Sequence, residues 1–139
     1  MAAVRRWGPV VLWMGLIFLL SAQSQLPSPE PQWLDKFVEK SSHFLEYAVL
    51  AALAMRALHN GRTWTWRDVG GALAIAALYA LSDEYHQSFV PGRNPDWSDI
   101  LFDWLGASAG VAAWLLVWTQ HHQRATDERV LYVLELDSF

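Results

Sequence analysis

The chain has 139 residues, 53% of them hydrophobic and 17% charged, whereas soluble domains usually carry about 25% charged residues. Its nine tryptophans are many for this length, and tryptophan is enriched where a bilayer meets water. The net charge of −4 argues against a nucleic-acid-binding surface, and the absence of cysteine excludes disulfides and thiolate metal sites. The composition indicates one small domain in a lipid bilayer.

Four apolar segments divide the chain and predict four helices: residues 7–22, 44–58, 69–82 and 104–119. Each segment is shorter than the roughly 20 apolar residues that a bilayer core requires. To cross a membrane, each helix must therefore take up neighbouring polar residues, which brings polar groups into the bundle near one leaflet. The predicted fold is all-α, a four-helix transmembrane bundle over residues 1–119 followed by a tail over residues 120–139.

The first segment also fits a second interpretation. Arg5 and Arg6 precede its apolar run, which ends in Leu20, Ser21 and Ala22, and this order resembles a signal peptide. A cleaved leader would leave three spans, which need no separate export signal. We therefore favour an uncleaved first helix.

The distribution of basic residues predicts the orientation, because cytoplasmic loops carry an excess of Lys and Arg. With the N-terminus inside, the inner side holds Arg5, Arg6, Arg56, Arg62, Arg67, Arg124 and Arg129. The outer side then holds Lys36, Lys40 and Arg93. The sequence thus predicts a multi-pass protein of the cell membrane with both termini and the tail on the cytoplasmic side.

The connections differ in composition. Residues 23–35 are rich in proline and predict an irregular outer loop, whereas residues 59–68 form a short basic inner loop. Residues 88–98 contain Pro-Gly and Asn-Pro pairs and predict a turn. Candidate helix caps are Thr63 or Thr65, and Asp96 or Ser98. Residues 130–136 are not placed by the pattern; they either lie along the inner membrane surface or are disordered.

Ionisable and other polar residues from distant parts of the chain converge at the outer ends of three predicted helices. Helical spacing puts those of the second helix on one face, those of the fourth helix on one face, and Asp83, His86 and Gln87 of the third helix on one face. They are Lys36, Lys40, His43 and Tyr47 on the second helix, Asp83, Glu84, His86 and Gln87 on the third, Arg93 in the loop, and Asp99 and Asp103 on the fourth. Ionisable groups at membrane depth are costly, so they usually pair and often mark function.

Two interpretations of this convergence stay open. In the first, Lys40 and Arg93 form a salt-bridge network with the carboxylates and only hold the helices together. In the second, the residues line a polar pocket that opens outward. Lys36, Lys40 and Arg93 would then bind anionic groups, and the carboxylates and His86 would bind a polar headgroup, a cation or a proton.

An enzymatic version of the pocket uses His86 with Asp83 or Glu84 as the catalytic residues, by general acid–base chemistry. The carboxylates and histidine include enough ligands for a divalent cation, but their spacing matches no zinc motif such as His-Glu-x-x-His. Metal ligands are therefore not assigned, and no cofactor is predicted.

Gly106 and Gly110 form a small-xxx-small pattern, which lets two helices approach closely. Packing within the chain is favoured over a dimer contact, and the oligomeric state stays open.

Three stretches of the chain resemble the VanZ-like family of membrane proteins, named for a teicoplanin-resistance protein. They are residues 18–24, residues 36–53 with His43, Tyr47 and Leu50, and residues 83–93 followed by Asp99 and by Gly106 to Gly110. The last stretch is long and specific, and together they cover most of residues 18–110. The family often has asparagine where Asp103 stands, so the resemblance does not require a carboxylate there.

The resemblance implies a four-helix integral membrane protein linked to glycopeptide resistance of the teicoplanin type. With the outer polar residues, it predicts a pocket that binds or modifies an envelope component, such as a lipid-linked phosphate or a peptidoglycan precursor. The alternatives are a membrane-embedded hydrolase or transferase acting on envelope lipids, and a non-catalytic structural or accessory subunit. The expected partner in every case is the lipid bilayer, not nucleic acid.

Overall fold

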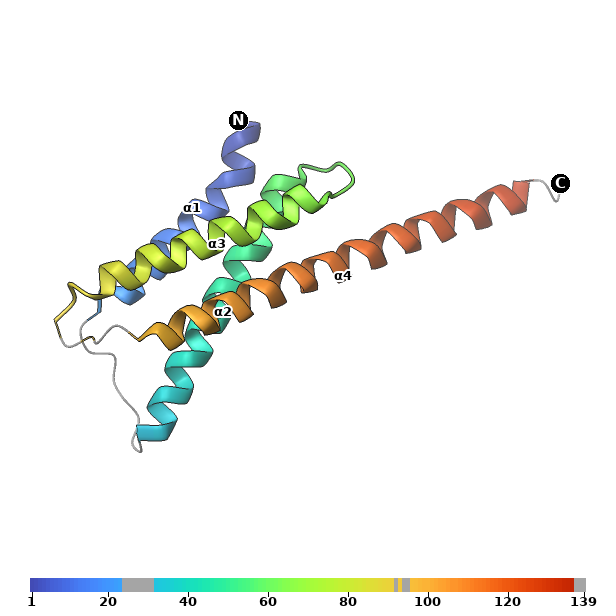
Figure 1. Ribbon diagram of the computed structural model, residues 1–139. Helices are drawn as coiled ribbons and strands as arrows, with labels where there is room; N and C mark the ends of the chain where they lie inside the picture. Colours follow the sequence, from blue (N-terminus) through green and yellow to red (C-terminus); the bar gives the residue numbers. More distant parts are fainter. Residues whose placement is uncertain (24–31, 92, 94–95, 137–139) are drawn as a thin grey trace.

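The computed structural model describes residues 1–23, 32–91, 93 and 96–136, and the regular structure in this part of the chain is entirely helical. The four helices are α1 (Ala2–Ser21), α2 (Gln32–His59), α3 (Trp66–Gln87) and α4 (Trp97–Leu136), as Figure 1 shows. The predicted all-α architecture with four helices is confirmed.

The helices are longer than the apolar segments that predict them. Helix α2 has 28 residues and α3 has 22, because polar turns extend both helices beyond their apolar parts. Helix α4 has 40 residues, and it continues without interruption through the predicted tail as far as Leu136. The prediction that each helix takes up polar residues at its ends is confirmed.

The predicted outer loop over residues 23–35 is too long. Residues 32–35 belong to the first turn of α2, which begins directly after the last proline of the segment and carries Asp35 near its positive end. The proline-rich part, residues 24–31, lies outside the described residues, as do Gly92 and the Asn94–Pro95 pair of the predicted turn.

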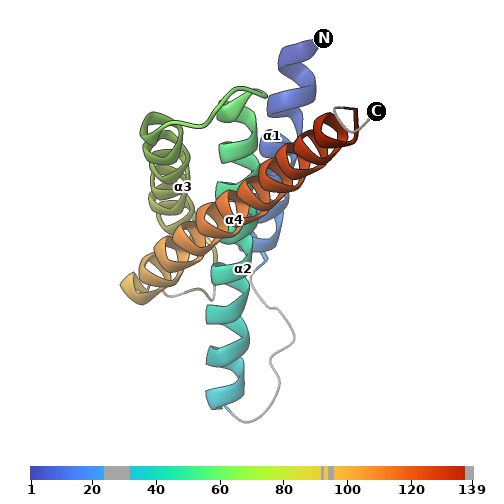
Figure 2. The ribbon, with the colours of Figure 1, turned by 90° about the vertical axis from the view of Figure 1, so that its right-hand side faces the viewer.

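The four helices alternate in direction, so the start of α2, the end of α3 and the start of α4 lie at one end of the molecule (Figure 1). Helix α2 packs against each of the other three, most extensively against α4. Figure 2 shows α4 crossing α2 obliquely, and in Figure 1 its C-terminal part extends away from the other helices.

The crossing of α2 and α4 depends on two glycines. A Cβ atom at Gly106 would overlap the carbonyl oxygen of Phe44, and a Cβ atom at Gly110 would overlap that of Ala48. Only the absence of a side chain at both positions lets the two backbones approach this closely. The expected packing of this motif within the chain is confirmed.

The short inner connection between α2 and α3 is held by a capping box. The backbone N–H of Thr65 donates to Asp68 Oδ2 at 2.7 Å, and the Thr65 hydroxyl donates to the same oxygen at 2.9 Å. Arg62 pairs with the other oxygen of Asp68 at 2.5 Å. Of the two candidate caps, Thr65 is therefore the one that begins α3.

Apolar side chains cover much of the surface, while several charged side chains are buried. Leu12 is 76% exposed and Leu19 is 63% exposed, whereas Asp83, Asp99 and Asp103 are between 2% and 4% exposed. Soluble proteins usually bury apolar side chains and expose charged ones, so the opposite arrangement in this chain suits a lipid environment. Helix α1 and residues Trp97–Ala125 of α4 are long and apolar enough to cross a membrane. Two of the four predicted spans are supported in this way.

Candidate functional site

Lys40 of α2 lies against the beginning of α4, and its ammonium group is fully engaged. Lys40 Nζ donates to Asp96 Oδ2 at 3.0 Å, to Ser98 Oγ at 2.6 Å and to the carboxylate of Asp99. Because an ammonium group has three N–H donors, these contacts use its whole capacity. The predicted ligand-binding role of Lys40 would require it to leave these partners.

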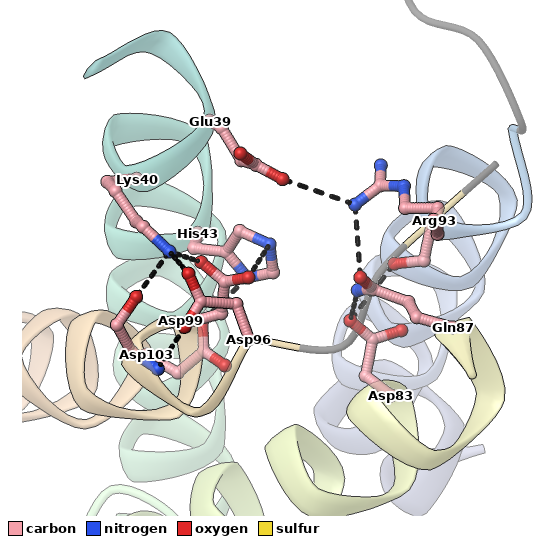
Figure 3. Close-up of polar contacts among 11 residues, drawn as sticks. Glu39, Lys40, His43, Asp83, Gln87, Arg93, Asp96, Asp99 and Asp103 are labelled. Carbon is pink, nitrogen blue, oxygen red and sulfur yellow. Dashed lines mark hydrogen bonds and ion pairs between the residues drawn. The ribbon is translucent and has the colours of Figure 1, made fainter. Parts of the chain in front are cut away.

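His43 lies one turn further along α2, between two carboxylates of α4. Its Nδ1 is 2.9 Å from Asp103 Oδ1, and its Nε2 is 4.0 Å from Asp99 Oδ2. All three side chains are buried, between 2% and 5% exposed. We call these residues the Lys40 cluster: Lys40, His43, Asp96, Ser98, Asp99 and Asp103 (Figure 3).

Asp96 precedes α4 and caps it. Its Oδ1 accepts the backbone N–H of Ser98 at 2.9 Å, while its Oδ2 accepts from Lys40. The Ser98 backbone bond and then the Lys40 ammonium lower the pKa of Asp96 to about 2. Of the two candidate caps for this helix, Asp96 is the residue that caps α4.

Asp83 of α3 forms a second set of contacts, toward α1 and the loop before α4. Its Oδ2 accepts from Ser21 Oγ at 3.0 Å and from Gln87 Nε2 at 2.9 Å. The side-chain amide oxygen of Gln87 accepts from an Arg93 guanidinium nitrogen at 3.0 Å. Arg93 also lies 3.9 Å from Glu39 of α2, so the chain of contacts in Figure 3 reaches three helices.

This second set includes buried polar atoms that lack partners in the described part of the chain. They are Asp83 Oδ1, Glu84 Oε1, the Tyr47 hydroxyl and His86 Nε2. Tyr47 is completely buried, and the centroid of its ring lies 6.3 Å from that of Tyr79 on α3. A buried polar atom without a hydrogen bond costs about 1–3 kcal/mol, so each of these four atoms is an unusual feature. We call these residues the Asp83 cluster: Ser21, Tyr47, Asp83, Glu84, His86, Gln87 and Arg93.

His86 contacts α1 rather than the neighbouring carboxylates. Its ring packs against that of Phe18 with the centroids 4.3 Å apart. Within the described residues, no hydrogen bond joins His86 to Asp83 or Glu84. The pairing of His86 with either carboxylate as a catalytic couple therefore stays a prediction.

Lys36 is exposed on α2 and forms no ion pair with another described residue. The remaining candidate residues belong to one of the two clusters. Among the described residues, no group of three or more His, Asp or Glu side chains is arranged to hold a metal ion.

Sequence reasoning missed Ser21 as a member of the site and Glu39 as a neighbour of Arg93, and it considered Asp96 and Ser98 only as caps. The position of Ser21 at the end of α1, at the same level as Asp83 near the end of α3, is the signal that indicates the first contact.

The sequence model of a family described as VanZ/LLP1 matches residues 7–118. No curated protein and no solved structure matches the chain. The matched residues include every member of both clusters.

Proposed function

Because the chain belongs to the VanZ/LLP1 family, we propose that it is a four-span protein of the cell membrane with an outward-facing polar site for an envelope component. Helices α1 and α4 are apolar enough to span. Helix α2 packs against both of them and against α3, and this packing supports the proposal that α2 and α3 cross the membrane with them.

The orientation rests on the basic residues at the end opposite the clusters. Arg56 donates to the backbone oxygen of Arg6 at 3.3 Å, and Arg62 pairs with Asp68 in the α2–α3 connection. The excess of arginine favours this end as the cytoplasmic one. The two clusters then lie on the extracytoplasmic side, with the N-terminus inside.

We assign different roles to the two clusters. The Lys40 cluster joins α2 to α4 and has its charges paired, which is what a purely structural contact requires. The Asp83 cluster binds the ligand. This assignment rests on the buried atoms of Tyr47, Asp83 and Glu84 that have no hydrogen-bond partner in the described part of the chain. Unpaired buried polar atoms would only destabilise a contact whose role is to hold helices together.

The ligand must offer groups that complement this cluster. Arg93 uses one guanidinium nitrogen for Gln87, and the other N–H donors suit an anionic group such as a lipid phosphate. Asp83 and Glu84 suit hydroxyl or amine donors. A polar headgroup with both features, on a membrane lipid or a peptidoglycan precursor, fits the site, and the family resemblance connects such a component with teicoplanin-type resistance.

The test is binding of envelope lipids to the purified full chain in detergent, followed by native mass spectrometry. A total envelope lipid extract is expected to give a retained lipid with the wild type that Asp83→Asn and Arg93→Gln lose at least about tenfold. The matched control is Lys36→Gln, which removes an exposed charge at the same end.

In cells, the same two variants, at normal membrane level, are expected to lose any teicoplanin tolerance that the wild type gives. Wild-type binding and tolerance in both variants would overturn the proposal.

A further inference from the structure

The side chain of Gln87 lies between two opposite charges. Its amide nitrogen donates to the Asp83 carboxylate at 2.9 Å, and its amide oxygen accepts from the Arg93 guanidinium at 3.0 Å (Figure 3). Gln87 is only 3% exposed. One neutral, planar amide group thus separates a carboxylate from a guanidinium that form no direct ion pair with each other within the described residues.

The neutral Gln87 amide forms one hydrogen bond with the Asp83 carboxylate and one with the Arg93 guanidinium, and it brings no opposite charge to either group. Hydrogen bonds between two charged groups are shorter and stronger than those in which one partner is neutral. A ligand group that offers a positive N–H donor to Asp83 and a negative oxygen to Arg93 would therefore replace the amide with a gain at each end. That pattern is a compact zwitterion, with its ammonium and its anion only a few bonds apart.

The free acceptors of Asp83 fit an ammonium group. If the Gln87 amide moves away, Asp83 Oδ2 loses one donor, and Asp83 Oδ1 has no partner in the described structure. A primary ammonium has three N–H donors, which is enough to donate to both oxygens of this carboxylate.

The same end of the molecule carries exposed aromatic side chains. They are Trp33, Phe37, Tyr85, Phe89 and Trp97, each between 65% and 78% exposed. Exposed aromatic side chains of a membrane protein gather at the level of the lipid headgroups. This level favours a headgroup over a dissolved solute as the source of the zwitterion.

We propose that Gln87 occupies the place of a phosphoethanolamine headgroup, whose ammonium binds Asp83 and whose phosphate binds Arg93. The inference rests on the proposed function, because it names the ligand of the same site. The lipid that carries this headgroup is phosphatidylethanolamine. Phosphatidylcholine keeps both charges but has no N–H donor, and phosphatidylglycerol keeps only the phosphate.

The experiment titrates the purified full chain in detergent with each of the three lipids and measures binding by native mass spectrometry. Phosphatidylethanolamine is expected to bind at least about tenfold more tightly than phosphatidylcholine, the equivalent of one charge-assisted hydrogen bond. Equal binding of these two lipids would overturn the inference. Water-soluble phosphoethanolamine, added as a competitor, reports whether the headgroup alone suffices or the acyl chains are needed.

Substitutions give effects of opposite sign. Gln87→Ala removes the amide that competes with the headgroup for Asp83 and Arg93, and it is expected to tighten phosphatidylethanolamine binding several-fold. Asp83→Asn is expected to reduce phosphatidylethanolamine to the level of phosphatidylcholine, and Arg93→Gln to weaken both phosphatidylethanolamine and phosphatidylglycerol. Lys36→Gln is the control without effect. Weaker binding by Gln87→Ala would also overturn the inference, and this variant decides the question even if Asp83→Asn does not fold.

The two proposals fail in different ways. If a lipid from the total extract binds through Asp83 and Arg93 but phosphatidylethanolamine does not, the proposed function stands and the phosphoethanolamine assignment is wrong. If no lipid from the extract depends on these residues, both are wrong.

Discussion

The Lys40 cluster and the Asp83 cluster lie at the same end of the molecule but differ in how far their polar atoms are paired. Lys40 reaches three acceptors, and His43 lies between two carboxylates. In the Asp83 cluster, a carboxylate and a guanidinium are separated by a neutral amide, and four buried atoms lack a partner in the described residues. Charge at membrane depth alone therefore does not identify a site, and our assignment of the binding region rests on its unpaired hydrogen-bonding atoms together with the Asp83–Gln87–Arg93 contacts.

The largest expected effect tests the structural half of this comparison. Asp99→Ala removes a partner of the partly buried Lys40 and of the buried His43, and it is expected to lower the free energy of unfolding by about 3–5 kcal/mol. Reversible denaturation in detergent, followed by circular dichroism, measures the change.

Glu39→Ala is the matched control, because Glu39 is 45% exposed and its ion pair with Arg93 is long. Its expected cost is under about 1 kcal/mol. An Asp99→Ala variant no less stable than Glu39→Ala would mean that the Lys40 cluster does not hold α2 to α4.

A second prediction concerns the crossing on which the Lys40 cluster depends. Gly110→Val places a side chain against the backbone of Ala48 and is expected to lower the free energy of unfolding by about 1–3 kcal/mol. Gly15→Val is the control, since a Cβ atom at Gly15 meets nothing within 4 Å. Equal stability of the two variants, measured by the same denaturation, would show that the close approach of α2 and α4 is dispensable.

The third prediction sharpens the other half of the comparison. Asp83→Asn keeps an oxygen that accepts from Ser21 but removes the charge, so the free energy of unfolding is expected to change by less than about 1 kcal/mol. The same variant is expected to lose lipid binding. A loss of stability as large as that of Asp99→Ala would place Asp83 among the structural residues.

The smallest expected effect depends on pH. The pKa of Asp96 is lowered in the folded protein from 3.8 to about 2, so its contribution to stability is complete above about pH 4 and is lost as the pH falls toward 2. Its side chain is 57% exposed, which keeps the contribution small. Midpoints of thermal unfolding between pH 2 and 5 are expected to fall less steeply for Asp96→Asn than for the wild type; parallel curves would contradict this.

The apolar segments were enough to predict four helices and their alternating directions, because hydrophobic runs dominate local structure in a bilayer protein. The helix ends were not predictable from hydropathy. Polar turns such as residues 32–35 and residues 120–136 continue the helices, where capping and backbone hydrogen bonding decide the outcome.

The meeting of Lys40 and His43 with Asp99 and Asp103 follows from helical spacing and antiparallel order, which the sequence contains. The division of the polar residues into two clusters does not follow from spacing or helix order. It depends on the oblique crossing of α4 over α2, which pairs one set of charges, and on the contact between Asp83 of α3 and Ser21 of α1. Lys36 shares a face with Lys40 by spacing, yet it is exposed, because α2 begins beyond the region that α4 covers.

The glycine crossing also has a mechanical consequence. Helix α4 touches α2 most closely at Gly106 and Gly110, and its axis continues from there to Leu136 over about 39 Å. A rotation of α4 by about 10° about this crossing point would displace its far end by about 7 Å for that length of helix. Because Asp96 and Asp99 lie on the short side of this crossing, a small movement of the polar end would be amplified at the far end of α4.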